Sequence, residues 1–376
     1  MLKNLLAWGA GLLLSASIIT GCGSAPTSGE KSPASPNGEE KSAYVVTDIQ
    51  GREVRFEKVP KSAAVIGHGG LKIYTYVCGD NGLIGVEDIE KRGRTVTGQS
   101  FHHAYPNIRN LDTVGKGGPE IVPDHEQLAY KKPEVIFAAY QSKDEMDTLQ
   151  AKLNIPVVGL LSGSKDNIFN EEVYQTFAIV GKTMNRTERA EEIIRFLKET
   201  QNDLQKRAGG AISGPRVYMG GCSFRGEQGI LSTKEHVDLL DTVKVNNVMN
   251  NLTKEKGMIL DKEKLLEIDP ELILLDLSGK KRILGELEKD PRFFDSLTAF
   301  QQGETYAIMP YFTYGMNFDT ALLDMYYIGK LTHPDGFTDI DIEAKAKEIY
   351  TLFVGKNVYD ELRQVYPEAF KKFQRK

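Results

Sequence analysis

Hydrophobic positions along the chain gather in short runs rich in β-branched residues, and stretches with helical spacing separate these runs. A short apolar run bounded by turn residues is typical of a buried strand, and strands that alternate with helices are typical of a parallel sheet. The pattern therefore predicts an α/β protein. The predicted strands occupy residues 63–66, 83–86, 135–139, 156–160, 216–219, 272–275 and 305–308, and a hairpin is predicted from 44–47 and 53–56.

A long helical pattern divides these strands into two groups. It begins near Asn170, breaks at Gly181, resumes at Thr187 and ends at Gly209. At about 1.5 Å per residue, a helix of about twenty residues has the width of a domain. We therefore predict two Rossmann-like lobes with mostly parallel sheets, joined by one long helix. The predicted parts are an N-terminal α/β lobe at 43–165, a connecting helical segment at 166–213 and a C-terminal α/β lobe at 214–376.

The N-terminal residues differ in composition from the rest. Residues 1–21 place one lysine ahead of a long apolar run, which is typical of a signal peptide for export, although an uncleaved N-terminal anchor is an alternative. The next residue, Cys22, ends a segment that resembles the lipoprotein box of bacteria, in which the cysteine is acylated. The alternative is an ordinary secretory signal with a chance cysteine. Residues 22–42 then form a lipidated cysteine and a flexible tether, because they are too polar to pack.

Charge and cysteine content exclude several classes of protein. The formal net charge is −5, whereas a generic nucleic-acid binder has a basic excess, so we expect no nucleic-acid partner. Three cysteines are too few for a disulfide scaffold or for a zinc site made only of cysteines. Of these, Cys78 and Cys222 lie in different lobes, and buried free thiols are favoured over a disulfide that would clamp the lobes together.

Several motifs, in order along the chain, resemble one known family. The chain is similar from 43 to 356 to the substrate-binding lipoproteins of ABC importers for iron–siderophore, haem and corrinoid complexes. Two departures are Glu134 and Glu271, where the family usually has Asp, and a longer, more basic loop at 92–119. The motifs are Thr47-Asp48-Ile49-Gln50-Gly51-Arg52-Glu53-Val54, Val114-Gly115, Glu126-Gln127-Leu128, Lys132-Pro133-Glu134-Val135-Ile136, Asp269-Pro270-Glu271-Leu272-Ile273 and Gly303-Glu304-Thr305-Tyr306.

The resemblance implies a function in transport and no enzymatic activity. We expect a monomer that captures an iron chelate of the siderophore type between its lobes and delivers it to an ABC permease dimer with a cytoplasmic ATPase. The lipid anchor at Cys22 would hold it at the outer face of the cytoplasmic membrane, and no cofactor is expected. An enzyme is disfavoured, because the chain has too few cysteines for an iron–sulfur cluster and no HExxH or Ser/His/Asp signature.

Candidate ligand-binding residues follow the predicted strands. In open parallel sheets, ligands bind beyond the carboxyl ends of the strands. Arginine pairs with carboxylate or catecholate oxygens, and tyrosine offers a flat face with a hydroxyl, so both suit a ferric chelate. The candidates after strands are His68, Tyr140, Arg225, Tyr311 and Tyr314, and the basic loop adds Arg92, Arg94, His102, His103 and Tyr105.

Other interpretations of these residues stay open. Loop tyrosines are often half-exposed without a function, Arg225 can simply pair with Glu227, and adjacent histidines such as His102 and His103 are often solvated. Alternatively, His102 and His103 bind a metal ion. The rival functions are binding of haem or a corrinoid, binding of a bare transition-metal ion with the help of His68, and ligand sensing by a lipoprotein that signals to a membrane receptor.

Two further acidic residues have a role that the resemblance implies. In the family, one exposed glutamate on each lobe docks against arginines of the permease dimer, and Glu126 and Glu263 are the matching positions. The alternative is that both are ordinary acidic residues at the start of a helix, where the helix dipole favours them.

Overall fold

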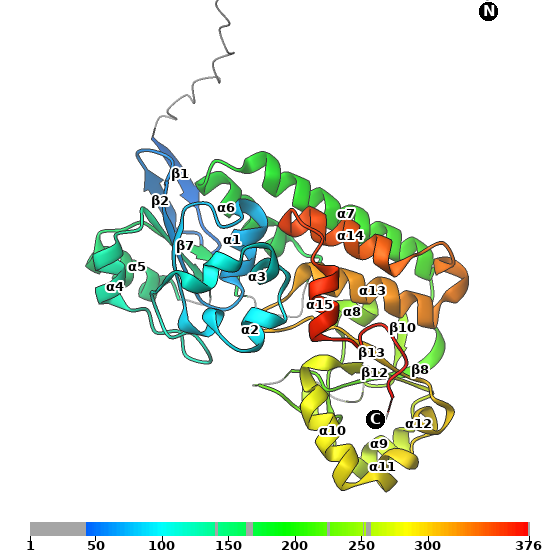
Figure 1. Cartoon of the computed structure of the whole chain (residues 1–376). Coiled ribbons are helices and arrows are strands. Elements are labelled where there is room, and N and C mark those ends of the chain that lie inside the picture. Colours follow the sequence, from blue (N-terminus) through cyan, green and yellow to red (C-terminus); the bar gives the residue numbers. More distant parts are fainter. Residues whose placement is uncertain are drawn as a thin grey trace, which may run out of the picture. The chain divides into compact units, whose positions relative to one another are not determined.

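The computed structural model of the chain describes residues 43–374, except 140–141, 163–167, 224–225, 251 and 253–256 (Figure 1). The predicted signal peptide, the lipidated Cys22, the tether and the candidates Tyr140 and Arg225 lie outside the described residues. Within the described part, no helix is both long and apolar enough to cross a membrane.

The first strands form the predicted hairpin, which is tied to the sheet behind it. β1 (Tyr44–Thr47) and β2 (Glu53–Phe56) pair antiparallel. Between them, Arg52 Nη1 lies 2.9 Å from Asp48 Oδ2, and both residues are buried. The same Nη1 donates to the carbonyl oxygen of Val157 at 2.7 Å, and the Gly159 N–H donates to Asp48 at 2.9 Å. The buried Asp48–Arg52 pair of the first motif therefore joins the hairpin to the last strand of the first sheet.

The first sheet has five parallel strands in the order β5-β4-β3-β6-β7. Every residue of β3, β6 and β7 is buried, as expected when helices cover both faces of a parallel sheet. The strands are β3 (Ala63–Ile66), β4 (Leu83–Val86), β5 (Asp112–Thr113), β6 (Val135–Ala139) and β7 (Val157–Leu160), with the helices α1 (Gly70–Cys78), α4 (His125–Lys131) and α5 (Lys143–Leu153) between them.

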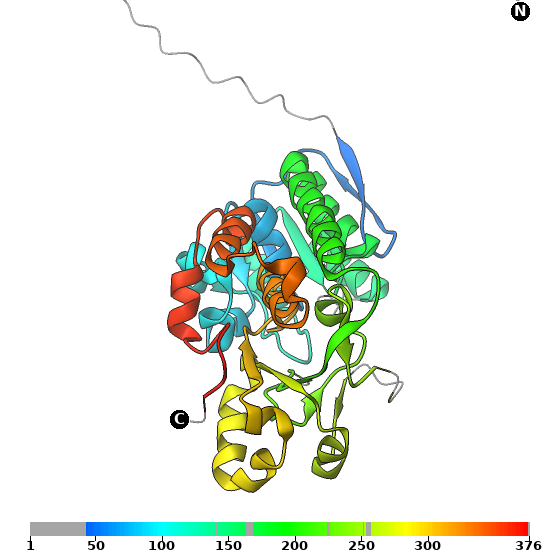
Figure 2. The same cartoon turned by 90° about the vertical axis from the view of Figure 1, so that its right-hand side faces the viewer.

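The second sheet has four parallel strands in the order β10-β8-β12-β13. The C-terminal tail returns to its edge, where the Phe373 N–H donates to the carbonyl oxygen of Thr305 at 2.8 Å (Figure 2). The strands are β8 (Ser213–Gly220), β10 (Val245–Asn247), β12 (Leu272–Asp276) and β13 (Thr305–Ile308), beside the short antiparallel pair β9 (Ser232–Thr233) and β11 (Met258–Ile259). The helices of this part are α8 (Asp238–Asp241), α9 (Lys262–Ile268), α10 (Lys280–Lys289), α11 (Pro291–Asp295) and α12 (Thr298–Gln302), with a 3-10 turn at Leu277–Gly279.

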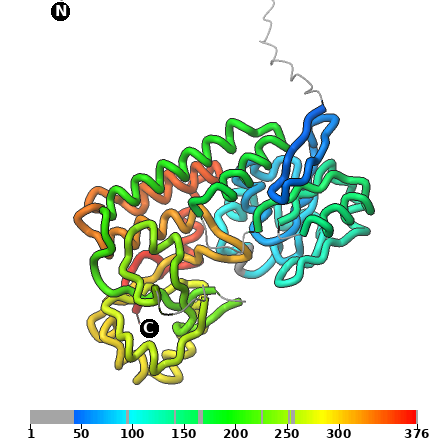
Figure 3. Tube along the Cα trace, turned by 180° about the vertical axis from the view of Figure 1, so that it is seen from behind, coloured from blue at the N-terminus to red at the C-terminus, as the bar shows by residue number. Residues whose placement is uncertain are grey.

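Long helices connect the two sheets. α6 (Glu171–Thr183) and the 22-residue α7 (Thr187–Ala208) lead from the first to the second, and Gly209 ends α7 as predicted. After the second sheet, α13 (Phe318–Thr332) packs on α7, and α14 (Ile342–Val354) packs on α1, so the chain returns to the first half (Figure 3). The predicted fold class is confirmed: two α/β halves with mostly parallel sheets. A 3-10 turn at Pro334–Phe337 and α15 (Tyr359–Val365) complete the chain.

The segment at 92–119, which the sequence presents as a loop, contains short helices. They are held by Phe101 and Ile108, both of which are buried in the core. The apolar residues are too widely spaced to show a helical period, so the sequence pattern did not reveal them. The elements are α2 (Arg94–Thr97), α3 (Ser100–Ala104) and a 3-10 turn at Pro106–Asn110, and another 3-10 turn at Asp88–Lys91 precedes them.

Candidate functional site

Loops from the two halves meet at the carboxyl ends of the strands. Tyr314, which follows β13, packs its ring against His68, which follows β3; the ring centroids lie 4.6 Å apart. The Tyr314 hydroxyl donates to Glu87 Oε2 at 2.7 Å, and the Gly118 N–H donates to the Tyr314 hydroxyl at 3.1 Å. Glu87 and Gly118 belong to the first half. Tyr314 therefore joins three loops of the first sheet to the second half, and we call His68, Glu87 and Tyr314 the junction cluster.

Backbone conformation places these side chains. At Gly67 φ is +92°, and a Cβ atom there would lie 1.6 Å from the carbonyl oxygen of Ala139, so only glycine fits between the ends of β3 and β6. Tyr314 has a φ of +51°, which is uncommon for a residue with a side chain, and it lies in a tight turn that the Thr313 N–H closes on the Gly315 carbonyl oxygen at 3.0 Å. Because a tyrosine rarely adopts this left-handed backbone conformation, we expect contacts from outside the turn to stabilise it.

Lys72 supplies that support from the first half. Its side chain leaves α1 and is completely buried. The Nζ atom donates to the carbonyl oxygens of Thr313, of Tyr314 at 3.1 Å and of Gly315 at 2.9 Å. One ammonium group thus fixes the whole turn. Burial lowers the pKa of Lys72 to about 8, while the negative charges of Glu90 and Asp319 act in the opposite direction.

A second layer of buried polar groups lies around Lys72. Asp319, at the start of α13, accepts hydrogen bonds from Ser100 Oγ and from the Tyr76 hydroxyl at 3.0 Å. Burial raises the pKa of Asp319. Glu90 Oε2 lies 3.8 Å from His102 Nε2, and both residues are buried. His102 therefore faces a buried carboxylate, whereas the sequence suggested a contact with the ligand.

Burial sets the protonation of the junction cluster. It raises the pKa of Glu87 to about 7, against the lowering effect of the Tyr314 hydroxyl. It lowers the pKa of His68, and the neighbouring Lys72 adds to this effect. Burial therefore favours the uncharged forms of both the His68 imidazole and the Glu87 carboxyl group.

An aromatic surface with a cation lies after β13 and β9. Lys234 Nζ lies 5.3 Å from the ring centroid of Tyr311 and 4.8 Å from that of Phe312. Tyr311 is buried, Phe312 is half-buried and Lys234 is buried. A desolvated ammonium over an aromatic face is attracted to the ring electrons. The two predicted tyrosines, Tyr311 and Tyr314, thus lie in different surroundings although they belong to one loop.

The remaining predicted ligand residues make contacts of their own. The Arg92 side chain is 69% exposed and pairs with Asp88. His103 is half-buried, and its Nε2 lies 2.9 Å from the carbonyl oxygen of Thr97. The Tyr105 hydroxyl donates to the carbonyl oxygen of Val354 at 2.9 Å. Arg94 is the first residue of α2. These partners of Arg92, His103 and Tyr105 lie outside the junction cluster, and the role of the three residues in binding stays a prediction.

Comparison with known proteins identifies the class of this chain. The sequence pattern of the family described as "Periplasmic binding protein" matches residues 99–311, which is more than half of the chain. The chain belongs to the periplasmic binding protein family. Its members are extracytoplasmic solute-binding proteins that work with ABC transporter permeases, and this binding protein shares that general role.

Solved structures share the fold of this periplasmic binding protein. A periplasmic solute-binding protein from Veillonella parvula has 21% identity and a TM-score of 0.71, over 86% of this chain and 96% of that chain. The molybdate-binding protein MolA from Haemophilus influenzae has 19% identity and a TM-score of 0.64, over 84% of this chain and 98% of that chain. The haem-binding protein HutB of Vibrio cholerae has 14% identity and a TM-score of 0.52, over 72% and 98%. No curated protein sequence matches the chain.

Glu87, Lys72 and Asp319 are site residues of this binding protein that the sequence did not reveal. Glu87 directly follows β4, so the rule that selected His68 would also have selected it. Lys72 is the only charged residue in the otherwise apolar α1, and this is the signal that could have found it. Asp319 lies in α13 far along the chain, and nothing in its local sequence indicates a contact with Ser100.

Metal ligands do not cluster in the described part of this periplasmic binding protein. There, no group of three or more His, Cys, Asp or Glu side chains has an arrangement that could hold a metal ion. His102 and His103, the two proposed metal ligands, have different neighbours: His102 is buried beside Glu90, and half-buried His103 lies beside the carbonyl oxygen of Thr97. Cys78 and Cys222 are free, buried thiols, as the sequence suggested.

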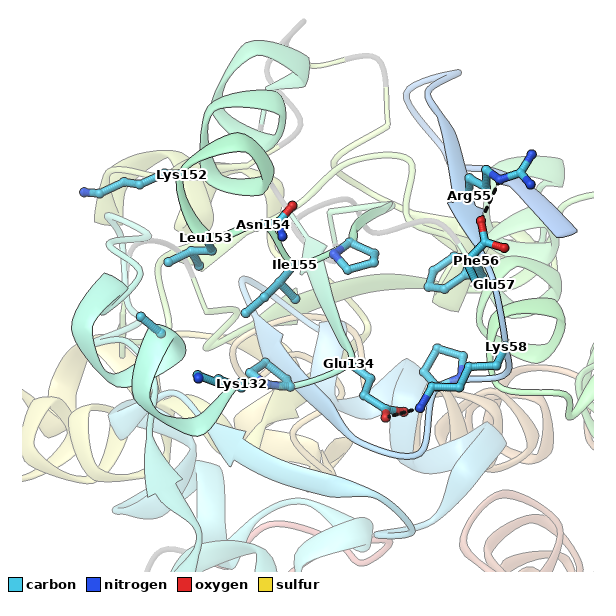
Figure 4. A pocket seen from close by; sticks show the side chains of 14 residues that line it. Arg55, Phe56, Glu57, Lys58, Lys132, Glu134, Lys152, Leu153, Asn154 and Ile155 are labelled. Carbon is cyan, nitrogen blue, oxygen red and sulfur yellow. Dashed lines mark hydrogen bonds and ion pairs between the residues drawn. The ribbon is translucent and has the colours of Figure 1, made fainter. Parts of the chain in front are cut away.

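A cavity of about 720 Å³ lies away from the junction cluster. It opens between β2 and the loops that precede β6 and β7, at the amino ends of the strands (Figure 4). Two ion pairs border it, Arg55 with Glu57 at 2.9 Å and Lys58 with Glu134 at 3.0 Å. Because ligands of parallel sheets bind at the carboxyl ends, this cavity is distinct from the candidate site.

Proposed function

We propose that this protein binds an iron chelate of the siderophore type at the junction cluster and delivers it to an ABC permease. The observation that carries the proposal is the contact of Tyr314 with His68 and Glu87, because it places polar and aromatic groups from both halves at one point. A ligand bound there touches both halves at once. In this proposal the protein forms and breaks no covalent bond, and the binding energy is used only to recognise the chelate.

The chemistry of the surroundings favours an anionic complex with flat organic groups. Phe312 is half-buried, Tyr311 is buried beside it, and the ammonium of Lys234 lies over both rings. Ferric chelates combine aromatic or delocalised groups with negative charge, and a buried cation beside aromatic rings matches both properties. Among solved structures with this fold, MolA holds molybdate and HutB binds haem, so anionic and planar solutes are both compatible with the scaffold.

A panel titration tests this proposal. The mature chain is titrated with ferric catecholate, ferric hydroxamate, ferric citrate, haem, cobalamin, molybdate and Ni²⁺, and the melting temperature and tyrosine fluorescence are measured. A solute at one hundred times its Kd stabilises the folded state by about 2.7 kcal/mol, so we expect a clear rise in melting temperature with one ferric chelate. A rise with Ni²⁺ or molybdate alone would overturn the assignment to iron chelates.

Two tyrosine variants localise the binding. Tyr314→Phe removes the hydroxyl that joins Glu87 and Gly118, and we expect it to weaken binding of the chelate about tenfold. Tyr130→Phe is the matched control, because Tyr130 is 77% exposed on α4 and lies away from the junction cluster. Equal affinities for the two variants would exclude the junction cluster as the binding site.

Delivery to the permease is proposed to use Glu126 and Glu263. Each is an exposed residue in the first turn of a short helix, α4 in one half and α9 in the other. Reversal of both charges, Glu126→Lys with Glu263→Lys, should abolish uptake and leave the affinity for the chelate unchanged. A loss of affinity would instead indicate that the two carboxylates support the fold.

Attachment to the membrane is proposed to use Cys22. Acylation of its sulfur and amino group would anchor the chain durably, since two or more acyl chains are needed for stable attachment. Cys22→Ala should move the protein from the membrane fraction to the soluble fraction without changing the affinity for the chelate. Retention of Cys22→Ala in the membrane fraction would favour an uncleaved N-terminal anchor.

A further inference from the structure

Exposed apolar side chains lie beside both proposed docking glutamates. Val122 is 57% exposed and Ile259 is 56% exposed. Each precedes the N-cap aspartate of its helix by two positions and the glutamate by four, Val122 before Glu126 and Ile259 before Glu263. Single exposed apolar residues need no explanation, but the same residue class at the same place in two halves does.

Each glutamate also has an apolar neighbour on the following helical turn. Tyr130, four residues after Glu126, is 77% exposed, and Leu266, three residues after Glu263, is 37% exposed. Residues three or four apart lie on the same face of a helix. We call Val122, Glu126 and Tyr130 the first patch, and Ile259, Glu263 and Leu266 the second patch. Together they hold four of the seven exposed large hydrophobic residues in the described part of the chain.

Backbone hydrogen bonds fix both apolar residues ahead of their helices. The Lys116 N–H donates to the Val122 carbonyl oxygen at 3.4 Å, and the next residue, Pro123, forms a β-bridge with Gly115. Ile259 pairs with Ser232 in the short sheet of β9 and β11. The backbone of both residues is therefore held in place before any partner arrives, which lowers the entropy cost of association.

Charge beside the first patch indicates the chemistry of its partner. A hollow of about 370 Å³ adjoins Val122 and is lined by His125, Asp144 and Glu145 among others. Asp144 and Glu145 are exposed, so the hollow has an acidic rim next to Glu126. An arginine or lysine of the partner fits this hollow, and an apolar surround that excludes water strengthens such a pair.

We propose that the two patches are equivalent docking surfaces, in which Val122, Tyr130, Ile259 and Leu266 pack on apolar side chains around a basic residue of each permease subunit. The proposal rests on the proposed function and adds to it that apolar contact, as well as charge, holds the permease. The repeat of one surface pattern in two halves matches a partner that presents the same surface twice, namely a dimer with two-fold symmetry.

Binding to the permease–ATPase complex of the source cell, purified in lipid nanodiscs, tests the proposal. The mature full chain carries Val122→Ser, Ile259→Ser or both, and affinity is measured by biolayer interferometry. Loss of a central apolar contact costs more than about 1 kcal/mol, so we expect each single variant to bind about tenfold more weakly and the double variant about a hundredfold.

A matched control removes an exposed apolar residue elsewhere. Ile212→Ser changes a side chain that is 61% exposed and precedes β8, outside both patches, and it should bind as the wild type does. Thermal unfolding and affinity for the chelate must stay unchanged in every variant, so that a lost contact is separated from a lost fold.

The experiment distinguishes a failure of the proposed apolar contacts from a failure of the proposed function. If Val122→Ser with Ile259→Ser binds like the wild type while the double charge reversal at Glu126 and Glu263 abolishes binding, the apolar inference is wrong and the proposed docking stands. If the charge reversal also leaves binding unchanged, both are wrong. A hundredfold loss in the double serine variant with normal binding of Ile212→Ser supports the inference.

Discussion

The two halves contain the same helix–strand–helix unit, but several of its side chains differ between them. In the first half α4, β6 and α5 follow one another, and in the second α9, β12 and α10; α4 and α9 have seven residues each, and β6 and β12 five each. Three residues separate helix from strand in both, Lys132-Pro133-Glu134 and Asp269-Pro270-Glu271, and the first of each has a positive φ. Apolar and turn positions agree between the halves, whereas the hydrogen bonds of their polar side chains differ.

Polar side chains at matching positions make different contacts in the two halves, although the backbone follows the same path. Asp124 caps α4 through the Gln127 N–H at 2.9 Å, but Asp261 makes no side-chain cap on α9. Leu149 of α5 is buried, whereas α10 has Glu286 at the matching place, and its Oε2 accepts the Ile230 N–H at 2.9 Å. The path of the chain therefore depends on buried apolar residues and turns, and the surface groups can diverge for separate tasks.

The largest effect is expected at the buried leucines that the halves share. Leu128 and Leu265 are both fully buried, in separate cores. Leu128→Ala and Leu265→Ala should each lower the free energy of unfolding by about 2–5 kcal/mol, measured with urea. Leu266→Ala, with its side chain partly exposed, is the control and should cost much less. A large loss at one leucine and none at the other would contradict the equivalence of the two units.

The next effect concerns the glutamate that replaces an apolar residue in the second half. Glu286→Leu leaves the buried Ile230 N–H without its acceptor and should lower the free energy of unfolding by about 1–3 kcal/mol. Glu286→Gln keeps a carbonyl oxygen in place and should retain most of the stability. If Glu286→Leu is as stable as Glu286→Gln, the hydrogen bond to Ile230 does not contribute to the free energy of unfolding.

A smaller, unequal effect is expected at the N-caps. Asp124→Ala removes the acceptor of the Gln127 N–H and should cost about 1 kcal/mol, the usual loss for such a cap. Asp261→Ala removes no cap bond and should leave stability nearly unchanged. Thermal unfolding of the two variants in parallel measures the difference; equal losses would mean that both aspartates act through the helix dipole alone.

The smallest effect is a pH dependence at Glu134, the glutamate before β6. Glu134 accepts the Lys61 N–H at 2.6 Å and pairs with Lys58, and the Lys61 bond lowers the pKa of Glu134. A lowered folded-state pKa gives stability that is present above the unfolded pKa and lost as the pH falls through the folded pKa. Glu134→Gln should therefore be less stable than the wild type at pH 7, and the difference should shrink towards pH 3.

Glu271→Gln is the matched control for the loss of stability at pH 7. Glu271 accepts the Arg216 N–H at 2.8 Å, and the described contacts include no lysine partner for its carboxylate. The loss of stability at pH 7 should therefore be smaller than that of Glu134→Gln. If the two glutamine variants lose equal stability at pH 7, Lys58 contributes nothing to the stability of the first half.

Much of the fold could be predicted from the sequence because buried parallel strands are nearly continuous apolar runs. β3, β4 and β6 have the predicted limits, and α7 ends at the predicted glycine. Strands of two or three residues, such as β5, show no period and were missed. The motif glutamates Glu134 and Glu271 now have a structural role, since each accepts an N–H at or just before a neighbouring strand.

The candidate site was harder to predict, because its contacts join distant segments. The rule that ligands bind after parallel strands selected His68 and Tyr314, which lie together. Nothing in the local sequence could show that His102 is buried beside Glu90, or that the Lys72 ammonium supports the turn of Tyr314. Periodicity describes one element at a time, whereas these contacts depend on how elements far apart are packed.

The distance along the chain between Lys72 and its acceptors has a consequence for folding. The contact with Thr313 spans 241 residues, so closing it requires nearly the whole chain to be in place, and long-range closure is slow. A nascent chain that ends before Thr313 would contain the complete first sheet but no partner for the lysine. We therefore expect the turn of Tyr314 to be the last part to acquire protection against hydrogen exchange during refolding and an early part to lose it.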